Sequence, residues 1–130
     1  MMALSASQMV AAAKGRTERL TPDQLVAALR DGTVTVIDIR EEEERVRDGY
    51  LAGSHHAPRG MLEFYADPTS PWHRLEFDPG NRVVLACDTG ARSALAAETL
   101  QRMGYRHAFY LDGGLHAWVA QGLPVERTRP

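Results

Sequence analysis

The sequence is poor in cysteine, since Cys87 is the only one in 130 residues. A single cysteine excludes an internal disulfide and a cysteine-based metal cluster. It also leaves the chain without a second thiol that could resolve a disulfide, so any disulfide formed by Cys87 must be intermolecular. The chemistry of this thiol, if it has any, therefore involves a second molecule.

The sequence also lacks long apolar runs and a strong excess of charge. No apolar segment is long enough to span a membrane. The first fourteen residues carry no early positive charge and do not resemble a secretory signal. The formal net charge is −2, which gives no reason to expect a nucleic-acid partner. We therefore expect a cytoplasmic protein without a membrane or nucleic-acid partner.

What the sequence does contain is an alternation of short apolar strands with helical segments. A chain of this length forms one domain and can bury roughly two-thirds of its extended surface. The alternation predicts an α/β domain with a mainly parallel sheet and helices on both faces. We assign residues 1–15 to an N-terminal helical extension and residues 16–130 to this domain. Strands are expected at 17–20, 34–39, 55–57, 83–86 and 108–111, and helices at 5–14, 22–31, 41–48, 60–65, 91–103 and 114–121.

The stretch around Cys87 organises the rest of the chain. The apolar run Val83–Ala86 is typical of a strand buried on both faces, and it stops at Cys87. From Ala91 the chain is rich in strong helix formers, and Gly104 ends that segment. Cys87 is therefore expected in a tight turn between a buried strand and the N-terminus of a helix.

That position has chemical consequences for a thiol. The first turn of a helix offers unpaired N–H groups and the positive end of the dipole, which stabilise an anion such as a thiolate. Gly90 allows successive N–H groups to converge, Arg92 adds a positive charge and Ser93 adds a hydroxyl donor. The stretch is interpreted as a cradle for a sulfur nucleophile and an anionic group attached to it. The alternative is a buried structural cysteine, the commoner fate of a lone cysteine; a strand-to-helix turn, where α/β proteins bind ligands, favours the reactive interpretation.

The same stretch resembles a known family. The pattern Cys87-x-x-Gly90-x-Arg92-Ser93 after a Val-rich strand is similar to the active-site loop of the rhodanese sulfurtransferases. Three flanking segments agree with that family in type and order, and the whole match covers roughly residues 20–126. They are Val-Ile-Asp-Ile-Arg-Glu at 36–41, Gly-Tyr-Leu-Ala-Gly-Ser-His-His-Ala at 49–57, and Leu-Asp-Gly-Gly-Leu-His-Ala-Trp at 111–118, followed by Gly-x-Pro-Val at 122–125.

The resemblance implies a rhodanese-like fold and a sulfurtransferase without cofactor or metal. Such an enzyme moves a sulfane sulfur from thiosulfate, a thiosulfonate or a low-molecular-weight persulfide to a thiol or cyanide. Its nucleophile would be Cys87, which carries the sulfur as a persulfide, and a sulfur-accepting protein is a further partner that the family allows. The loop that would hold substrate and persulfide consists of Asp88, Thr89, Gly90, Ala91, Arg92 and Ser93.

Two other functions stay open. A persulfide-carrier module would deliver sulfur to a partner enzyme with little turnover on small molecules. Cysteine phosphatases and arsenate reductases also combine a cysteine, an amide cradle and an arginine. The phosphatases that share the rhodanese fold place five residues between the cysteine and the arginine, whereas four separate Cys87 from Arg92 here. A smaller loop suits one sulfur atom better than a phosphoryl group.

Asp88 and Thr89 depart from the thiosulfate-using members of the family, which often carry basic residues at one or both positions. A carboxylate beside Cys87 would repel a dianion, so thiosulfate is a doubtful natural donor. Three residues at the same edge of the sheet are assigned to a supporting pocket: Asp38, Arg40 and Arg59. Asp38 either orients a cation of the pocket or forms a structural ion pair with Arg40 or Arg59. Arg59 either contacts an anionic donor or is a solvated surface arginine.

The remaining polar and aromatic candidates receive plainer interpretations. His55 and His56 are adjacent on a strand and point to opposite faces, so they cannot share a metal, and no metal site is expected. The four glutamates at 41–44 are interpreted as a solvated helix start that the helix dipole favours. Trp118 is expected in the core, and Trp72 either rims the pocket or covers a core edge.

Overall fold

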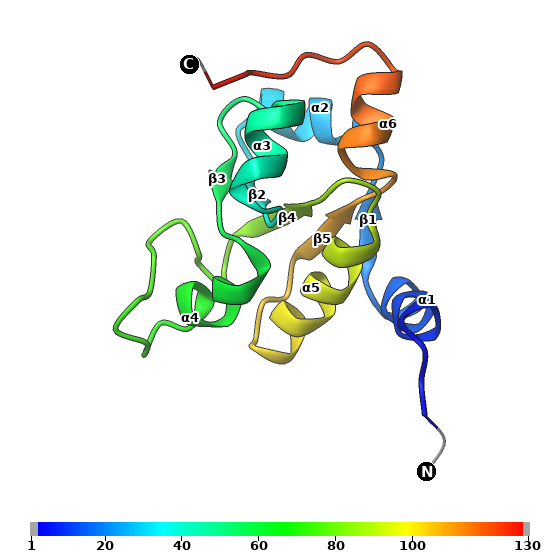
Figure 1. The fold of residues 1–130 in the computed structure, drawn as a ribbon. Helices are drawn as coiled ribbons and strands as arrows, with labels where there is room; N and C mark the ends of the chain where they lie inside the picture. Colours follow the sequence, from blue (N-terminus) through cyan, green and yellow to red (C-terminus); the bar gives the residue numbers. More distant parts are fainter. Residues whose placement is uncertain (1–2, 129–130) are drawn as a thin grey trace.

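Five short parallel strands form one sheet in the order β1-β5-β4-β2-β3 (Figure 1). The computed structural model describes residues 3–128. The predicted α/β class and parallel sheet are confirmed. The strands are β1 (Glu18–Leu20), β2 (Val34–Asp38), β3 (His55–His56), β4 (Arg82–Ala86) and β5 (Ala108–Leu111). The helices are α1 (Ala6–Arg16), α2 (Pro22–Asp31), α3 (Glu42–Asp48), α4 (Leu62–Ala66), α5 (Ala91–Arg102) and α6 (Gly114–Ala120), with a 3-10 turn at Arg59–Met61.

Strand β4 is the centre of the core. Side chains of a strand alternate between its faces, and both faces of β4 are covered. Val83 and Leu85 belong to the cluster formed with α1, α4 and α5. Val84 and Ala86 belong to the cluster formed with α2 and α6. Figure 1 shows these two layers on opposite sides of the sheet, with α3 beside α2 and α6. The prediction that this apolar run is a strand buried on both faces is confirmed.

The helix starts follow local sequence rules. Thr21 caps α2 by accepting from the Gln24 amide, and the Gln24 side chain accepts from the Thr21 amide, with Pro22 at the first position. The same reciprocal pair, formed by Ser5 and Gln8, begins α1. Such pairs satisfy N–H groups that the helix itself leaves open.

Helix α1 packs on the domain rather than lying apart from it. Ala13 is fully buried among residues of α5, and Arg16 lies 3.2 Å from Glu98 of that helix. Residues 1 and 2 of the predicted extension, and residues 129 and 130 of the predicted domain, lie outside the described residues. The division at residue 15 stays a prediction, while the contact between α1 and α5 is a property of the structure.

Some element boundaries differ from the predictions. The expected strand 34–39 ends at Asp38, although the Ile39 amide still donates to the Ala86 carbonyl at 3.0 Å. The expected helix 60–65 is a 3-10 turn followed by α4, because the Met61 amide bonds to the Pro58 carbonyl three residues earlier. Neither difference moves a residue near Cys87.

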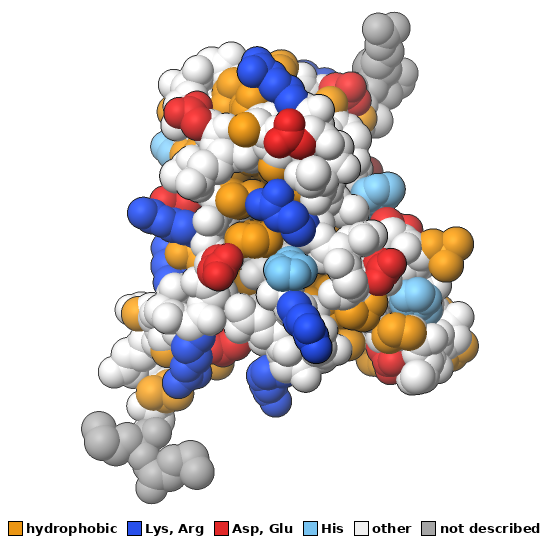
Figure 2. Space-filling view, turned by 180° about the vertical axis from the view of Figure 1, so that it is seen from behind, with side chains coloured by type: hydrophobic (Ala, Val, Ile, Leu, Met, Phe, Trp, Pro, Cys, Tyr) orange, Lys and Arg blue, Asp and Glu red, His pale blue; other side chains and the backbone are white. Residues whose placement is uncertain are grey.

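Charged side chains of both signs are distributed over the molecule. On the face shown in Figure 2, the described Lys and Arg side chains are interspersed with Asp and Glu, and form no patch of one sign. A cluster of Lys and Arg side chains on one face is the usual mark of a nucleic-acid-binding surface. Among residues 3–128, no helix has the length and apolarity to cross a membrane.

The parallel topology brings the ends of β2, β4 and β5 to one edge. Asp38 pairs in register with Ala86, so the chain segments after β2 and β4 start side by side. After β5 the chain turns at Gly113 and Gly114 into α6, and the Leu115 amide donates to the Cys87 carbonyl at 2.9 Å. The turn after β4 is therefore held from two directions.

Gly114 tests how tightly this edge is packed. Its φ is +60°, and a Cβ there would lie 2.5 Å from backbone atoms of Asp88. Gly122 is the matched control, because its φ is +76° but a Cβ there meets nothing within 4 Å. Both alanine variants should suffer the backbone cost of roughly 1–2 kcal/mol. Gly114→Ala should lose about 1–3 kcal/mol more in urea unfolding. Equal losses of unfolding free energy in the two variants would show that the Cys87 turn can move to make room for the added Cβ without destabilising the protein.

Candidate active site

Cys87 lies directly after β4, in the turn that leads into α5. Its Sγ accepts a hydrogen bond from the Gly90 amide at 3.1 Å and donates to Ser93 Oγ at 3.4 Å. Ser93 Oγ in turn donates to the Gly90 carbonyl at 3.1 Å. A hydroxyl can rotate its hydrogen, so Ser93 can donate to the sulfur once the thiol has lost its proton. The turn therefore offers a sulfur anion two donors.

Gly90 makes this turn compact. Its φ is +101°, a conformation that side chains with a Cβ rarely adopt. A Cβ there would also lie 3.3 Å from the Leu111 carbonyl oxygen. On the other side, the Asp88 carbonyl accepts from the His116 amide at 3.0 Å. Cys87 and Ser93 are buried, whereas Asp88 and Thr89 are exposed. The sulfur is held inside the turn while the next two side chains form its outer rim.

Arg92 does not bond to the sulfur but to α3. Its guanidinium makes a two-pronged contact with Glu44, with N–O distances of 2.7 and 2.9 Å. The hydrogen bonds from Arg92 lower the pKa of Glu44 to about 2, despite the opposing effect of burial. The same contact raises the pKa of Arg92, with smaller contributions from Cys87 and Asp88. The positive charge expected in the cradle is thus largely balanced by a carboxylate.

The interpretation of all four glutamates at 41–44 as solvated was wrong for Glu44. Its side chain is 19% exposed and bridges α3 to α5. It also accepts from the Glu41 amide at 2.8 Å, which forms a capping pair at the start of α3. The spacing of Glu41 and Glu44 signals that cap. Nothing in the sequence pattern pairs Glu44 with a residue 48 positions later.

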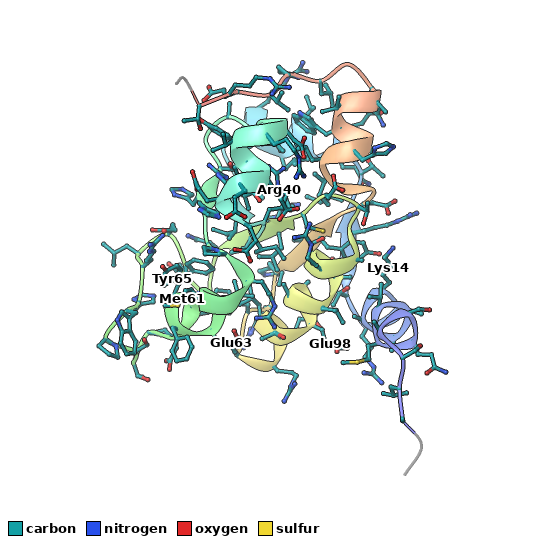
Figure 3. All side chains as sticks on the ribbon, viewed as in Figure 1. Lys14, Arg40, Met61, Glu63, Tyr65 and Glu98 are labelled. Atoms are coloured by element: carbon teal, nitrogen blue, oxygen red, sulfur yellow. The ribbon has the colours of Figure 1, made fainter. Side chains whose placement is uncertain are left out.

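The structure resolves the alternatives for Asp38. Its two carboxylate oxygens accept from Arg40 Nε at 3.1 Å, Arg40 Nη2 at 2.8 Å and Arg45 Nη1 at 2.9 Å. Asp38 and Arg40 are almost fully buried, and Figure 3 shows Arg40 below α3. They form the structural ion pair that was one of the two alternatives for Asp38. Sequence reasoning missed Arg45 as the second partner.

The Arg59 amide donates to the Ile39 carbonyl at 3.1 Å, next to Asp38, but its side chain is directed away from Asp38. Its guanidinium contacts Glu63 at 2.8 Å and Thr99 Oγ1 at 3.3 Å. It nevertheless shares with Arg92 a hollow of about 240 Å³ beside α5. The Arg59 guanidinium thus binds residues of α4 and α5, whereas the side chains of Asp38 and Arg40 bind each other.

A groove of about 400 Å³ begins at Asp88 and runs between the end of α3 and α6. Its lining residues are Asp48, Asp88, Leu115, His116, Val119, Ala120 and Arg127. Asp88 therefore lines a recess that begins one residue after Cys87, although Cys87 itself is buried and is not among the lining residues. Sequence reasoning named only Asp88 of this set, because the others come from α3, α6 and the C-terminal segment.

The other candidates lie outside this site. Trp118 is buried, as predicted. Trp72 is exposed and meets Phe64 edge-on, with ring centroids 5.8 Å apart. His56 lies 2.7 Å from the Arg40 carbonyl and 3.3 Å from Glu42. Within residues 3–128, no three His, Cys, Asp or Glu side chains are grouped so that they could hold a metal ion.

Comparison with solved structures places this geometry among known proteins. A protein of unknown function from Rhodopseudomonas palustris, described as a "Possible Tyrosine Phosphatase", is 38% identical, with a TM-score of 0.90 and 97% of each chain covered. The polysulfide-sulfur transferase homodimer of Wolinella succinogenes is 31% identical with a TM-score of 0.73, covering 92% of this chain and 85% of that one.

Curated relatives include proteins described as sulfurtransferases. A sulfurtransferase of Allochromatium vinosum is 30% identical over 92 residues, which are 71% of this chain and 78% of the relative. The thiosulfate sulfurtransferase GlpE of Glaesserella parasuis is 27% identical, and the match covers 82% of this chain and 91% of the relative. Against three other relatives, the chain spans only about half of their length. A model of the Rhodanese-like domain matches residues 21–121, and the chain therefore belongs to the rhodanese-like family.

Proposed function

We propose that this protein is a sulfurtransferase that carries a sulfane sulfur as a persulfide on Cys87. The observation that supports it most is the Cys87 turn, where the Gly90 amide and the Ser93 hydroxyl meet the sulfur at 3.1 and 3.4 Å. Hydrogen-bond donors placed around a sulfur at the end of a parallel strand stabilise a thiolate and the persulfide made from it.

The first step loads the cysteine. The Cys87 thiolate attacks the outer sulfur of a donor such as thiosulfate, a thiosulfonate or a small persulfide. A new S–S bond forms to Sγ while the S–S bond of the donor breaks, and its electron pair leaves with sulfite, a sulfinate or a thiolate. The outer sulfur of the new persulfide bears the negative charge, which the donors of the turn stabilise.

The second step unloads it. A thiolate or cyanide attacks the outer sulfur of the persulfide. The bond between that sulfur and Sγ breaks, and its electron pair returns to Cys87 as a thiolate. The acceptor leaves as a persulfide or as thiocyanate. The cycle takes no electrons from an outside reductant and loses none to an outside oxidant, so it needs only the sulfur donor and the acceptor.

Two relatives keep alternative functions in view. The putative sulfur carrier protein YrkF of Bacillus subtilis is 25% identical, and the chain covers 44% of it. A carrier function would use the same Cys87 persulfide with a protein as acceptor. The Rhodopseudomonas description favours a phosphatase instead. The small turn, with the Gly90 amide at 3.1 Å from Sγ, suits a single sulfur better than a phosphoryl group.

A sulfane donor should add the mass of one sulfur atom to the protein, and cyanide or a thiol should remove it. Cys87→Ser should add none. The measurement is intact mass after incubation with thiosulfate, a thiosulfonate and glutathione persulfide in parallel. An assay with an aryl phosphate serves as the comparison, and little hydrolysis is expected there. Sulfur transfer by the serine variant, or rapid phosphate release by the natural protein, would contradict the proposal.

Glu44→Gln should make the folded state less stable near neutral pH. Because folding lowers the pKa of Glu44 to about 2, its contribution to stability is fully present above its ordinary pKa of 4.5 and is lost as the pH falls toward 2. The difference in unfolding free energy between the natural protein and the variant should therefore narrow between pH 4.5 and 3. Glu43→Gln, on the exposed side of α3, is the control. A pH-independent difference would contradict the assignment.

Asp88→Lys should improve loading by thiosulfate. Thiosulfate is a dianion, and two unit charges about 6 Å apart at a protein surface interact by roughly 2–3 kcal/mol before salt screening. The gain should appear mainly as a lower KM, should be smaller for a singly charged thiosulfonate, and should shrink as salt is raised. Steady-state kinetics at low and high ionic strength measure it. Unchanged thiosulfate kinetics at low salt would mean that Asp88 does not act on the donor.

A further inference from the structure

The groove between α3 and α6 is lined by both apolar and charged residues. Leu115, Val119 and Ala120 form an apolar strip along α6, and Val119 is half exposed. The groove begins at Asp88, the residue after Cys87. Its volume of about 400 Å³ falls within the roughly 300–1,000 Å³ of small-molecule sites. The groove is thus large enough for a small organic molecule bound beside the Cys87 turn.

Two charges of opposite sign are free in this groove. Asp48 is paired with Arg47 at 2.9 Å. Within residues 3–128, by contrast, neither Asp88 nor Arg127 forms an ion pair, and Arg127 Nη1 donates only to the Arg47 carbonyl at 3.0 Å. The Arg47 guanidinium lowers the pKa of Asp48, and Arg127 adds to that effect. The charge of Arg127 therefore reaches the groove, opposite in sign to Asp88.

Resting on the proposed function, we propose that this groove binds the acceptor thiol, and that the acceptor is a zwitterion of the cysteine type. Its ammonium group would lie near Asp88 and its carboxylate near Arg127, with the carbon chain on the strip of α6. A ligand with one charge of each sign matches a site with one free charge of each sign.

The unloading step gives a physical reason for this match. The Cys87 persulfide and the attacking thiolate are both anions, and the Asp88 carboxylate adds a third negative charge beside them. Arg92 offers little compensation, because Glu44 already holds it at 2.7 and 2.9 Å. An ammonium carried by the acceptor offsets this repulsion. The thiolate then bonds to the outer sulfur, the bond to Sγ breaks, and Cys87 recovers its electron pair.

The test separates loading from unloading. Cys87 is loaded with an excess of a singly charged thiosulfonate, and the protein is then desalted. The loaded protein is mixed with one of four thiols, and intact mass follows the loss of one sulfur atom. The thiols are cysteine, cysteamine, which lacks the carboxylate, 3-mercaptopropionate, which lacks the ammonium, and 2-mercaptoethanol, which lacks both. Each unloading rate is first divided by the concentration of the thiolate form of the thiol. It is then divided by the rate at which the same thiol unloads the persulfide of the urea-unfolded protein, which removes differences in intrinsic reactivity between the thiols. Cysteine should be fastest, by roughly threefold to tenfold for each charge it adds.

Two substitutions assign the charges to residues. With Arg127→Gln, cysteine should no longer unload the protein faster than cysteamine does. With Asp88→Asn, cysteine should no longer unload it faster than 3-mercaptopropionate does. Arg106→Gln, an exposed arginine before β5 at the opposite edge of the sheet, should change neither ratio. Equal corrected rates for the four thiols, or slow unloading by all of them as expected for a protein acceptor, would overturn the inference. If thiosulfate, a thiosulfonate and glutathione persulfide all fail to load Cys87, the proposed function is overturned, and the inference with it.

Discussion

The buried carboxylate of Asp38 holds together the edge of the sheet on which the site is built. It ends β2 beside Ala86, the residue before Cys87, and it binds both Arg40 and Arg45 at 2.8–2.9 Å. Arg40 also donates to the Gly49 carbonyl at 2.7 Å, just after α3. Removing one partner of a buried ion pair typically costs about 3–5 kcal/mol, because the other charge is left uncompensated. One carboxylate thus fixes where α3 begins and ends relative to the strands.

The position of α3 decides the charge around Cys87. Because α3 is held over this edge, Glu44 reaches Arg92, and Asp48 reaches the groove that begins at Asp88. The turn itself is confined by β5 and α6, since both Gly90 and Gly114 lie too close to neighbouring backbone for a Cβ to fit without displacement. The result is a small, rigid cradle for sulfur whose nearest arginine is already paired. Such a site stabilises one negative charge better than two.

In the function that we propose, this arrangement separates the two halves of the sulfur-transfer cycle. The amide and hydroxyl donors that face Sγ serve any donor, because they act on the sulfur that is transferred. The groove along α6 touches only what approaches from outside the turn, so its charges select among acceptors. Relatives that match this chain include proteins described as a sulfurtransferase, a polysulfide-sulfur transferase and a putative sulfur carrier.

The sequence by itself determined the strand, turn and helix around Cys87, the parallel α/β class and the caps of α1 and α2. These features depend on residues a few positions apart, whose periodicity and capping chemistry are legible in a linear pattern. Only the tertiary structure decided that Glu44 pairs with Arg92, that Arg45 joins Asp38, and that the Arg59 guanidinium binds residues of α4 and α5. It also decided that Asp88 lines the same groove as Val119 and Arg127. Those contacts join residues that are distant in sequence, and a charged side chain shows no local preference among several partners of opposite sign until the packing of the helices brings one within reach.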